Sequence, residues 1–167
     1  MSLEVHKSVQ YAEDMTSPLL LTAISEADTD FVAELAADER VTAYIGDGQP
    51  WSRAYCEERV AHVLESPGIS WFIAWHGKVR IGLFTATQRA GAIEIGYWLS
   101  PEFWGQGLAK DLVALGIGQL EKAGITDLIA RVAPDNAASL KVLERQGFLV
   151  QSQDASLLTL TKAAGPL

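Results

Sequence analysis

The sequence contains almost no cysteine, has few basic residues and lacks any long apolar run. Cys56 is the single cysteine among 167 residues, which excludes an intramolecular disulfide and a thiolate metal cluster. No apolar run approaches the ~18 residues that a membrane helix needs, and the first residues lack the apolar segment of a signal peptide. These absences predict a cytoplasmic protein without a membrane segment.

The charge balance is acidic. Lys and Arg number 13 against 21 Asp and Glu, which gives a net charge of −8. Nucleic acid is therefore a poor partner, because phosphate backbones are bound by clustered cations. The acidity either favours the approach of a cationic substrate or serves solubility alone. His6, His62 and His76 are scattered without ligand spacing, so no metal site is predicted.

Apolar periodicity divides the chain into strands and helices in the order β-α-α-β-β-β-α-β-α-β-β. Strands are expected near 19–24, 71–75, 79–87, 93–99, 126–132, 148–150 and 157–161, and helices near 25–38, 52–66, 104–122 and 136–145. Residues 1–16 and the end at 165–166 show no periodicity and are expected to be irregular. The whole chain, 1–167, is interpreted as one α+β domain with its core at about 19–161.

The most informative stretch is Ile93 to Ala109. Alternating apolar residues predict a strand that Ser100-Pro101 ends, and a glycine within it, Gly96, favours a bulge. The following Trp-Gly-Gln-Gly-Leu-Ala sequence predicts a helix start with small residues, where another group can approach the backbone closely. Unpaired first-turn amides and the helix dipole make such a start an anion cradle.

This stretch matches neither of two common phosphate-binding motifs. A dinucleotide fingerprint requires glycine at the position of Lys110, and no Gly-Lys-Ser/Thr triplet of a Walker motif is present. The pattern Trp104-x-x-Gly107-x-Ala109 instead resembles motif A of the GNAT superfamily of N-acetyltransferases, Gln/Arg-x-x-Gly-x-Gly/Ala. Tryptophan in the first position, after Ile-Gly-Tyr-Trp-Leu, resembles the RimJ/RimL-type subgroup of ribosomal-protein N-terminal acetyltransferases.

This resemblance implies the GNAT fold, a mixed and mostly antiparallel sheet flanked by helices, with splayed central strands and acetyl-CoA as co-substrate. The helix-start amides would bind the pyrophosphate, and main-chain groups near the end of the central strand would bond the pantetheine amides. The rings of that strand, Tyr97 and Trp98, are expected in the core. The residues assigned to coenzyme binding are Trp98, Leu99, Trp104, Gly105, Gln106, Gly107, Leu108, Ala109, Lys110, Asn136 and Ser139.

A second resemblance lies between Asn136 and Phe148, which is similar to motif B of the same superfamily. Asn136 serves either as a helix cap or as a partner of the pantetheine arm. Many members carry a tyrosine acid at the position of Leu143, which has no hydroxyl. The resemblance to the subgroup implies a role for Ser139, which lies one turn after the cap. Ser139 is either the acid that protonates the departing thiolate or only a coenzyme ligand.

Glu94 is the one carboxylate on the central strand and is directed either into the cleft or to water. The resemblance implies a glutamate on this strand as the base that accepts the amine proton. An amine of pKa ~10.4 costs about 4.6 kcal/mol to deprotonate at pH 7, whereas an α-amine near ~8 costs about 1.4 kcal/mol. A single carboxylate can deprotonate the α-amine more easily than the amine of pKa ~10.4, which favours an acceptor of low pKa.

The sequence therefore predicts an N-acetyltransferase in which a primary amine, of a protein N-terminus or a small molecule, attacks the thioester in a ternary complex. Glu94 and Ser139 are the catalytic candidates. The alternative is a non-catalytic module that binds coenzyme A. A homodimer is compatible with either function. The segment between the first two helices, with Tyr44 and Trp51, is long enough to form one wall of the acceptor pocket.

Overall fold

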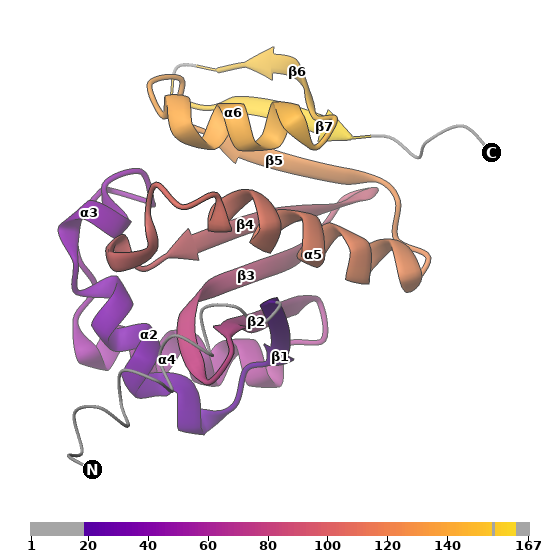
Figure 1. Cartoon of the computed structure of the whole chain (residues 1–167). Helices are drawn as coiled ribbons and strands as arrows, with labels where there is room; N and C mark the ends of the chain where they lie inside the picture. Colours follow the sequence, from indigo (N-terminus) through magenta and orange to yellow (C-terminus); the bar gives the residue numbers. More distant parts are fainter. Residues whose placement is uncertain (1–18, 155, 163–167) are drawn as a thin grey trace, which may run out of the picture.

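In a computed structural model, which describes residues 19–154 and 156–162, the described strands form one seven-stranded sheet in the order β1-β2-β3-β4-β5-β7-β6 (Figure 1). The strands are β1 (Leu19–Ala23), β2 (Ile69–His76), β3 (Val79–Arg89), β4 (Ala92–Leu99), β5 (Leu128–Val132), β6 (Leu149–Gln153) and β7 (Leu158–Lys162). Only β4 and β5 pair in parallel, whereas the other neighbours are antiparallel. The mixed, mostly antiparallel sheet is confirmed, and so is the predicted order of elements apart from one additional short helix between the first two predicted helices. The irregular ends expected at 1–16 and 165–166 lie outside the described residues.

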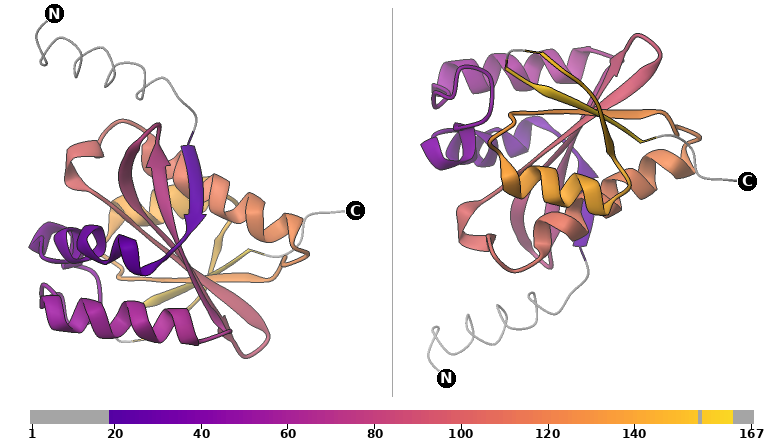
Figure 2. Two further views of the ribbon diagram at one scale, coloured as in Figure 1. Left: turned by 90° about the horizontal axis from the view of Figure 1, so that it is seen from below. Right: turned by 90° about the horizontal axis from the view of Figure 1, so that it is seen from above.

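The helices cover both faces of this sheet. They are α2 (Thr29–Ala36), α3 (Glu39–Thr42), α4 (Arg53–Glu65), α5 (Leu108–Lys122) and α6 (Ala137–Arg145). In Figure 2, α2 and α4 lie on one side of the strands and α5 and α6 on the other. Each face buries its own apolar cluster, so the sheet is the shared wall of two cores. No helix in the described part of the chain is long and apolar enough to cross a membrane.

The two neighbours of β4 pair with it over very different lengths. Its ladder with β3 runs without a register shift from Ala92 to Leu99, so the bulge expected at Gly96 is absent. A Cβ at Gly96 would lie 2.7 Å from Thr85 Oγ1, which explains the glycine by close packing instead. Its ladder with β5 contains only the pairs Ile93–Leu128 and Glu94–Ile129. Beyond Glu94 the two strands part, and the edge of β4 that faces β5 is left without strand partners.

Helix starts differ from the sequence expectation in two places. α5 begins at Leu108 rather than Trp104, because Gly105 and Gly107 take φ angles of +75° and +77°, outside the helical region. The short helix α3 was not predicted. It begins after Asp38, whose side chain accepts a hydrogen bond from the Arg40 amide at 2.9 Å. Residues around this short helix line one cavity together with the end of β4.

Candidate active site

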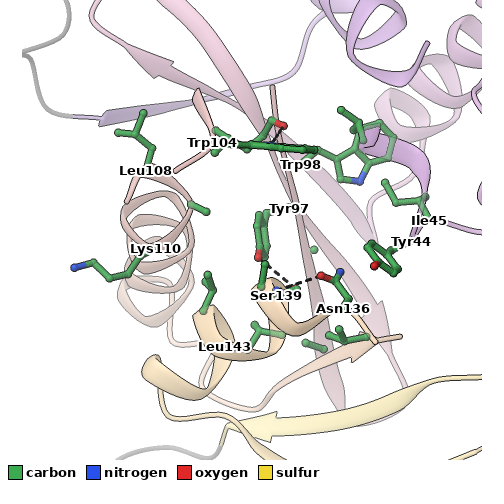
Figure 3. Close-up of a pocket in the computed structure, with 18 of the residues that line it drawn as sticks. Tyr44, Ile45, Tyr97, Trp98, Trp104, Leu108, Lys110, Asn136, Ser139 and Leu143 are labelled. Atoms are coloured by element: carbon green, nitrogen blue, oxygen red, sulfur yellow. Dashed lines mark hydrogen bonds between the residues drawn. The ribbon is translucent and has the colours of Figure 1, made fainter. Parts of the chain in front are cut away.

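A cavity of about 670 Å³ opens where β4 and β5 part (Figure 3). Its walls come from the second half of β4, the turn and first residues of α5, the end of β5, the inner side of α6, and the segment 40–45 that includes part of α3. All residues assigned to coenzyme binding line it except Gln106, whose side-chain amide donates to the Glu102 carbonyl at 3.3 Å. The sequence motifs are therefore brought together at one place.

One end of the cavity is built from main-chain amides. The N–H groups from Gly105 to Lys110 have no hydrogen-bond acceptor among the described residues, and no side chain caps α5. Gly107 occupies the N-cap in a left-handed conformation, and a Cβ there would meet nothing within 4 Å. Such a row of free donors at the positive end of a 15-residue helix attracts an anion.

The exposed Trp104 fixes this turn to the end of β4. Its indole Nε1 donates to the Leu99 carbonyl at 2.8 Å. This bond engages a main-chain acceptor on the strand edge that was expected to bind pantetheine, so one lone pair of that carbonyl is already used. Lys110 also borders the cavity, and Figure 3 shows its ammonium directed away from Tyr97 and Ser139.

The middle of the cavity contains a pair of hydroxyl groups. Tyr97 on β4 donates from Oη to Ser139 Oγ on α6 at 3.2 Å, across the space between the two elements (Figure 3). Burial raises the pKa of the Tyr97 phenol, and the hydrogen bond with Ser139 partly offsets this. The ring packs against the main core as expected, but the hydroxyl reaches the cavity. Sequence reasoning missed this contact, which joins residues 42 positions apart.

Helix α6 presents its first turn to the same place. Asn136 Oδ1 accepts a hydrogen bond from the Ser139 amide at 3.3 Å, so the capping role of this side chain is present. The NH₂ group of Asn136 is not used by the cap and remains a donor for a ligand in the cavity. Leu143 also lines the cavity and supplies only an apolar wall.

The opposite end of the cavity is made of side chains. Trp98 points away from the Tyr97 side and contacts Trp51 edge-on at a centroid distance of 4.9 Å. Tyr44 and Ile45 face it from the segment after α3, as Figure 3 shows. Of the two aromatic residues expected in this wall, Tyr44 lines the cavity and Trp51 does not. That the wall bounds an acceptor pocket stays a prediction. Trp51 supports the wall by packing behind it.

The charged groups at the wall are all basic. Arg40, Lys110, Arg131 and Arg145 border the cavity, and the described residues that line it include no Asp, Glu or His. Asp38 and Glu94 pair with two of these cations, Asp38 with Arg40 at 2.6 Å and Glu94 with Arg131 at 3.3 Å. No group of His, Cys, Asp or Glu within residues 19–154 and 156–162 could hold a metal ion.

Glu94 itself lies where β4 and β5 still pair, outside the cavity wall. Its Oε1 accepts from Arg89 Nε at 2.9 Å and lies 3.3 Å from Arg131. The carboxylate therefore serves an ion-pair cluster at the vertex of the two strands. Its role as the base stays a prediction to which the geometry gives no support.

Comparison with known proteins agrees with this geometry. Residues 18–149 match the family model described as an acetyltransferase (GNAT) domain. An uncharacterised N-acetyltransferase of Bacillus subtilis, YoaA, is 26% identical over 142 residues, which are 80% of each chain.

Two solved structures share the fold. The Salmonella typhimurium acetyltransferase that modifies the N-terminal serine of ribosomal protein L7/L12 superposes with a TM-score of 0.76 at 16% identity, over 90% of this chain and 98% of its own. A spermidine N-acetyltransferase of Vibrio cholerae, in complex with coenzyme A and spermine, gives 0.74 at 18% identity, over 86% and 92%.

Proposed function

The chain belongs to the acetyltransferase (GNAT) domain family, and we propose that it acetylates an amine of low pKa, foremost the α-amine of a peptide or protein N-terminus. Family membership makes the protein an acetyl-CoA-dependent N-acetyltransferase. Which amine it uses and which residues assist the reaction belong to the proposal.

The observation that carries the proposal is the parting of β4 and β5 beside an uncapped helix start. The amides from Gly105 to Lys110 would bind the coenzyme pyrophosphate, because they are the free donors at the positive end of α5. The pantetheine arm would follow the unpaired edge of β4, with the Asn136 amide as a further donor. The thioester would then lie in the middle of the cavity, near Tyr97 and Ser139.

The acceptor would enter from the side of Tyr44 and Trp98 and attack the thioester carbonyl directly. The new C–N bond forms, the C–S bond breaks with its electron pair going to sulfur, and the nitrogen gives its proton to solvent water. At neutral pH about one in ten α-amines of pKa ~8 is already uncharged, but only about one in 2,500 amines of pKa ~10.4. The described cavity wall offers no carboxylate or imidazole to remove this proton. The geometry therefore favours an acceptor that needs little help to lose it.

The departing sulfur would be met by the Ser139 hydroxyl. A thiolate of pKa ~8.5 is a tolerable leaving group at neutral pH, so a hydrogen bond to it suffices and a full proton transfer is not required. A serine hydroxyl is far too weak an acid to give up its proton in this step. We therefore assign Ser139 the role of hydrogen-bond donor to the sulfur rather than that of the general acid.

The test uses two matched peptides. One has a free α-amine and an acetylated lysine, and the other has an acetylated α-amine and a free lysine. We expect the first peptide to release coenzyme A thiol much faster, with kcat/KM rising tenfold per pH unit below the pKa of the α-amine. Cys56 does not disturb the thiol assay, because it is fully buried and burial raises the pKa of its thiol. Preference for the lysine peptide would refute the α-amine assignment.

The rival function is a module that binds coenzyme A without turnover. Calorimetry with coenzyme A, combined with a broad amine panel that includes spermidine, separates the two. Binding without transfer to any amine would establish the rival. The homodimer also stays a prediction. The exposed Leu149 and Val150 on edge strand β6 offer a surface for it, and sedimentation of the purified chain decides the oligomeric state.

A further inference from the structure

The hydroxyl groups of Tyr97 and Ser139 form a hydrogen bond that core packing does not require. The two oxygens lie 3.2 Å apart, and both side chains line the cavity. Tyr97 is carried by β4 and Ser139 by α6, so the hydrogen bond joins opposite walls of the cavity at its middle (Figure 3). A phenylalanine would fill the same core position without reaching the serine.

The direction of this hydrogen bond follows from the acceptors within reach. Tyr97 is partly buried, and within the described residues Ser139 Oγ is the only hydrogen-bond partner of its hydroxyl. A donor without an acceptor in a partly buried site is costly, so the phenol donates and Ser139 Oγ accepts. The serine proton is then left free to point into the cavity. The backbone of Ser139 is held as well, because its amide donates to Asn136 Oδ1 at 3.3 Å.

Full transfer of the Tyr97 proton to the thiolate is unfavourable in free energy. The ordinary pKa of tyrosine, ~10, exceeds the ~8.5 of a thiol by about 1.5 units, which disfavours the transfer roughly 30-fold at equilibrium. Burial raises the pKa of Tyr97 and makes the transfer less favourable still. What the phenol can provide at no such cost is a fixed hydrogen bond that leaves its proton in place.

We propose that Tyr97 is a positioning residue, whose hydroxyl orients Ser139 so that the serine O–H donates to the coenzyme sulfur. This positioning role rests on the proposed function only where it concerns the rate of acetyl transfer. During the reaction the C–S bond breaks, the electron pair stays on sulfur, and the thiolate is received by the Ser139 hydrogen bond. No proton leaves Tyr97 or Ser139. The thiolate is later protonated by solvent after release.

The first test measures the thiol of bound coenzyme A, without any acceptor. Its ionisation is followed by the ultraviolet absorbance of the thiolate as pH rises. An oriented hydrogen bond stabilises the thiolate, so we expect Tyr97→Phe to raise the pKa of the bound thiol by about 0.5–1 unit. Ser139→Ala should raise it at least as far. Tyr55→Phe, on the exposed side of α4, is the matched control and should leave it unchanged.

The second test is a double-mutant cycle on the single-turnover rate of acetyl transfer. We expect Ser139→Ala to slow transfer about tenfold and Tyr97→Phe about fivefold, with coenzyme affinity nearly unchanged. If Tyr97 acts only through Ser139, adding Tyr97→Phe to Ser139→Ala changes nothing further. Thermal unfolding of each variant checks that the fold is kept.

The outcomes separate the two hypotheses. Additive effects, or an unchanged pKa of the bound thiol in Tyr97→Phe, would overturn the positioning role while leaving acetyl transfer intact. Suppose that the wild-type chain transfers acetyl to no amine, yet Tyr97→Phe raises the pKa of the bound thiol as expected. That result would overturn only the proposed function. A chain that does not bind coenzyme A would overturn both.

Discussion

The two ends of the cavity are built from different parts of the chain. The end that includes Gly105 to Lys110 consists of main-chain amides on a helix start, next to the unpaired edge of β4. The end near Tyr44 and Trp98 consists of side chains from a segment between α3 and α4 and from one strand. We call these the coenzyme end and the acceptor end, after the ligands that we propose for them. Both are parts of one cavity about 670 Å³ in volume.

This difference has a chemical consequence. A main-chain donor is the same whatever the side chain, so the coenzyme end needs only residues that permit the backbone to take its shape. At the acceptor end, selectivity depends on the identity of each side chain. Substitutions at the coenzyme end should therefore act through backbone geometry and change coenzyme affinity. Substitutions at the acceptor end should change KM for the amine and leave coenzyme affinity unchanged.

The largest effect is expected from Gly107→Val. A non-glycine residue at φ +77° costs about 1–2 kcal/mol, and a β-branched residue costs more. The turn would relax by moving the amides of α5 out of line, and the new side chain would stand at the cavity wall. We expect coenzyme A to bind about 100-fold more weakly, as measured by calorimetry.

The matched control lies in the same helix. Gly118 is inside α5, has no positive φ, and a Cβ there meets nothing within 4 Å. Gly118→Ala should leave coenzyme affinity unchanged and raise stability by about 0.5–1 kcal/mol. If Gly107→Val retains the fold and binds coenzyme within threefold of the wild type, the amide cradle is not the binding site.

The next effect is expected at the acceptor end, from Tyr44→Ala. Tyr44 is 49% exposed, so its removal should cost little stability. We expect KM for the amine to rise about tenfold through loss of a contact wall, with coenzyme affinity unchanged. Leu64→Ala, a comparably exposed position on α4 outside the cavity, is the control. A matching loss of coenzyme affinity in Tyr44→Ala would show that the two ends are not separate.

The glycine-rich turn at the coenzyme end was predictable from the sequence because the residues that shape it are local, although the helix was expected to begin at Trp104 rather than Leu108. Gly105, Gly107 and Ala109 lie within five positions of one another, after a strand that a proline ends, and this spacing sets the backbone without help from distant residues. The order of strands and helices was predictable for the same reason. The absence of the expected bulge could not be foreseen, since the need for Gly96 comes from Thr85 on the neighbouring strand.

The acceptor end and the middle of the cavity were only partly predictable because their contacts are long-range. At the acceptor end Trp51 meets Trp98 across 47 positions, and in the middle of the cavity Tyr97 meets Ser139 across 42. The missing hydroxyl at Leu143 was the one available signal that another group must face the sulfur. It did not indicate Tyr97, because alternation along a strand assigns a ring to the core without telling how far its hydroxyl reaches.

A smaller effect at the coenzyme end is expected from Trp104→Phe. The change keeps an aromatic ring but removes the indole donor that holds the Leu99 carbonyl at 2.8 Å. A partly exposed neutral hydrogen bond contributes about 0.5–1.5 kcal/mol, so coenzyme affinity should fall roughly threefold, with the acceptor KM unchanged. Calorimetry and steady-state kinetics measure the two quantities separately. A rise in the acceptor KM alone would place Trp104 at the other end.

The smallest effect is expected from Glu94→Gln, at the vertex where β4 and β5 part, outside the cavity wall. Glutamine keeps a carbonyl oxygen for Arg89, and the lost charge belongs to a partly exposed cluster, so kcat with an α-amine acceptor should change less than about twofold. A general base would behave differently, because its removal costs ~10²–10⁴-fold, with the loss largest for amines of high pKa. Comparing an α-amine with a lysine amine in the same variant thus distinguishes the two roles. A hundredfold loss would establish Glu94 as the base and require the acceptor to approach the vertex of β4 and β5.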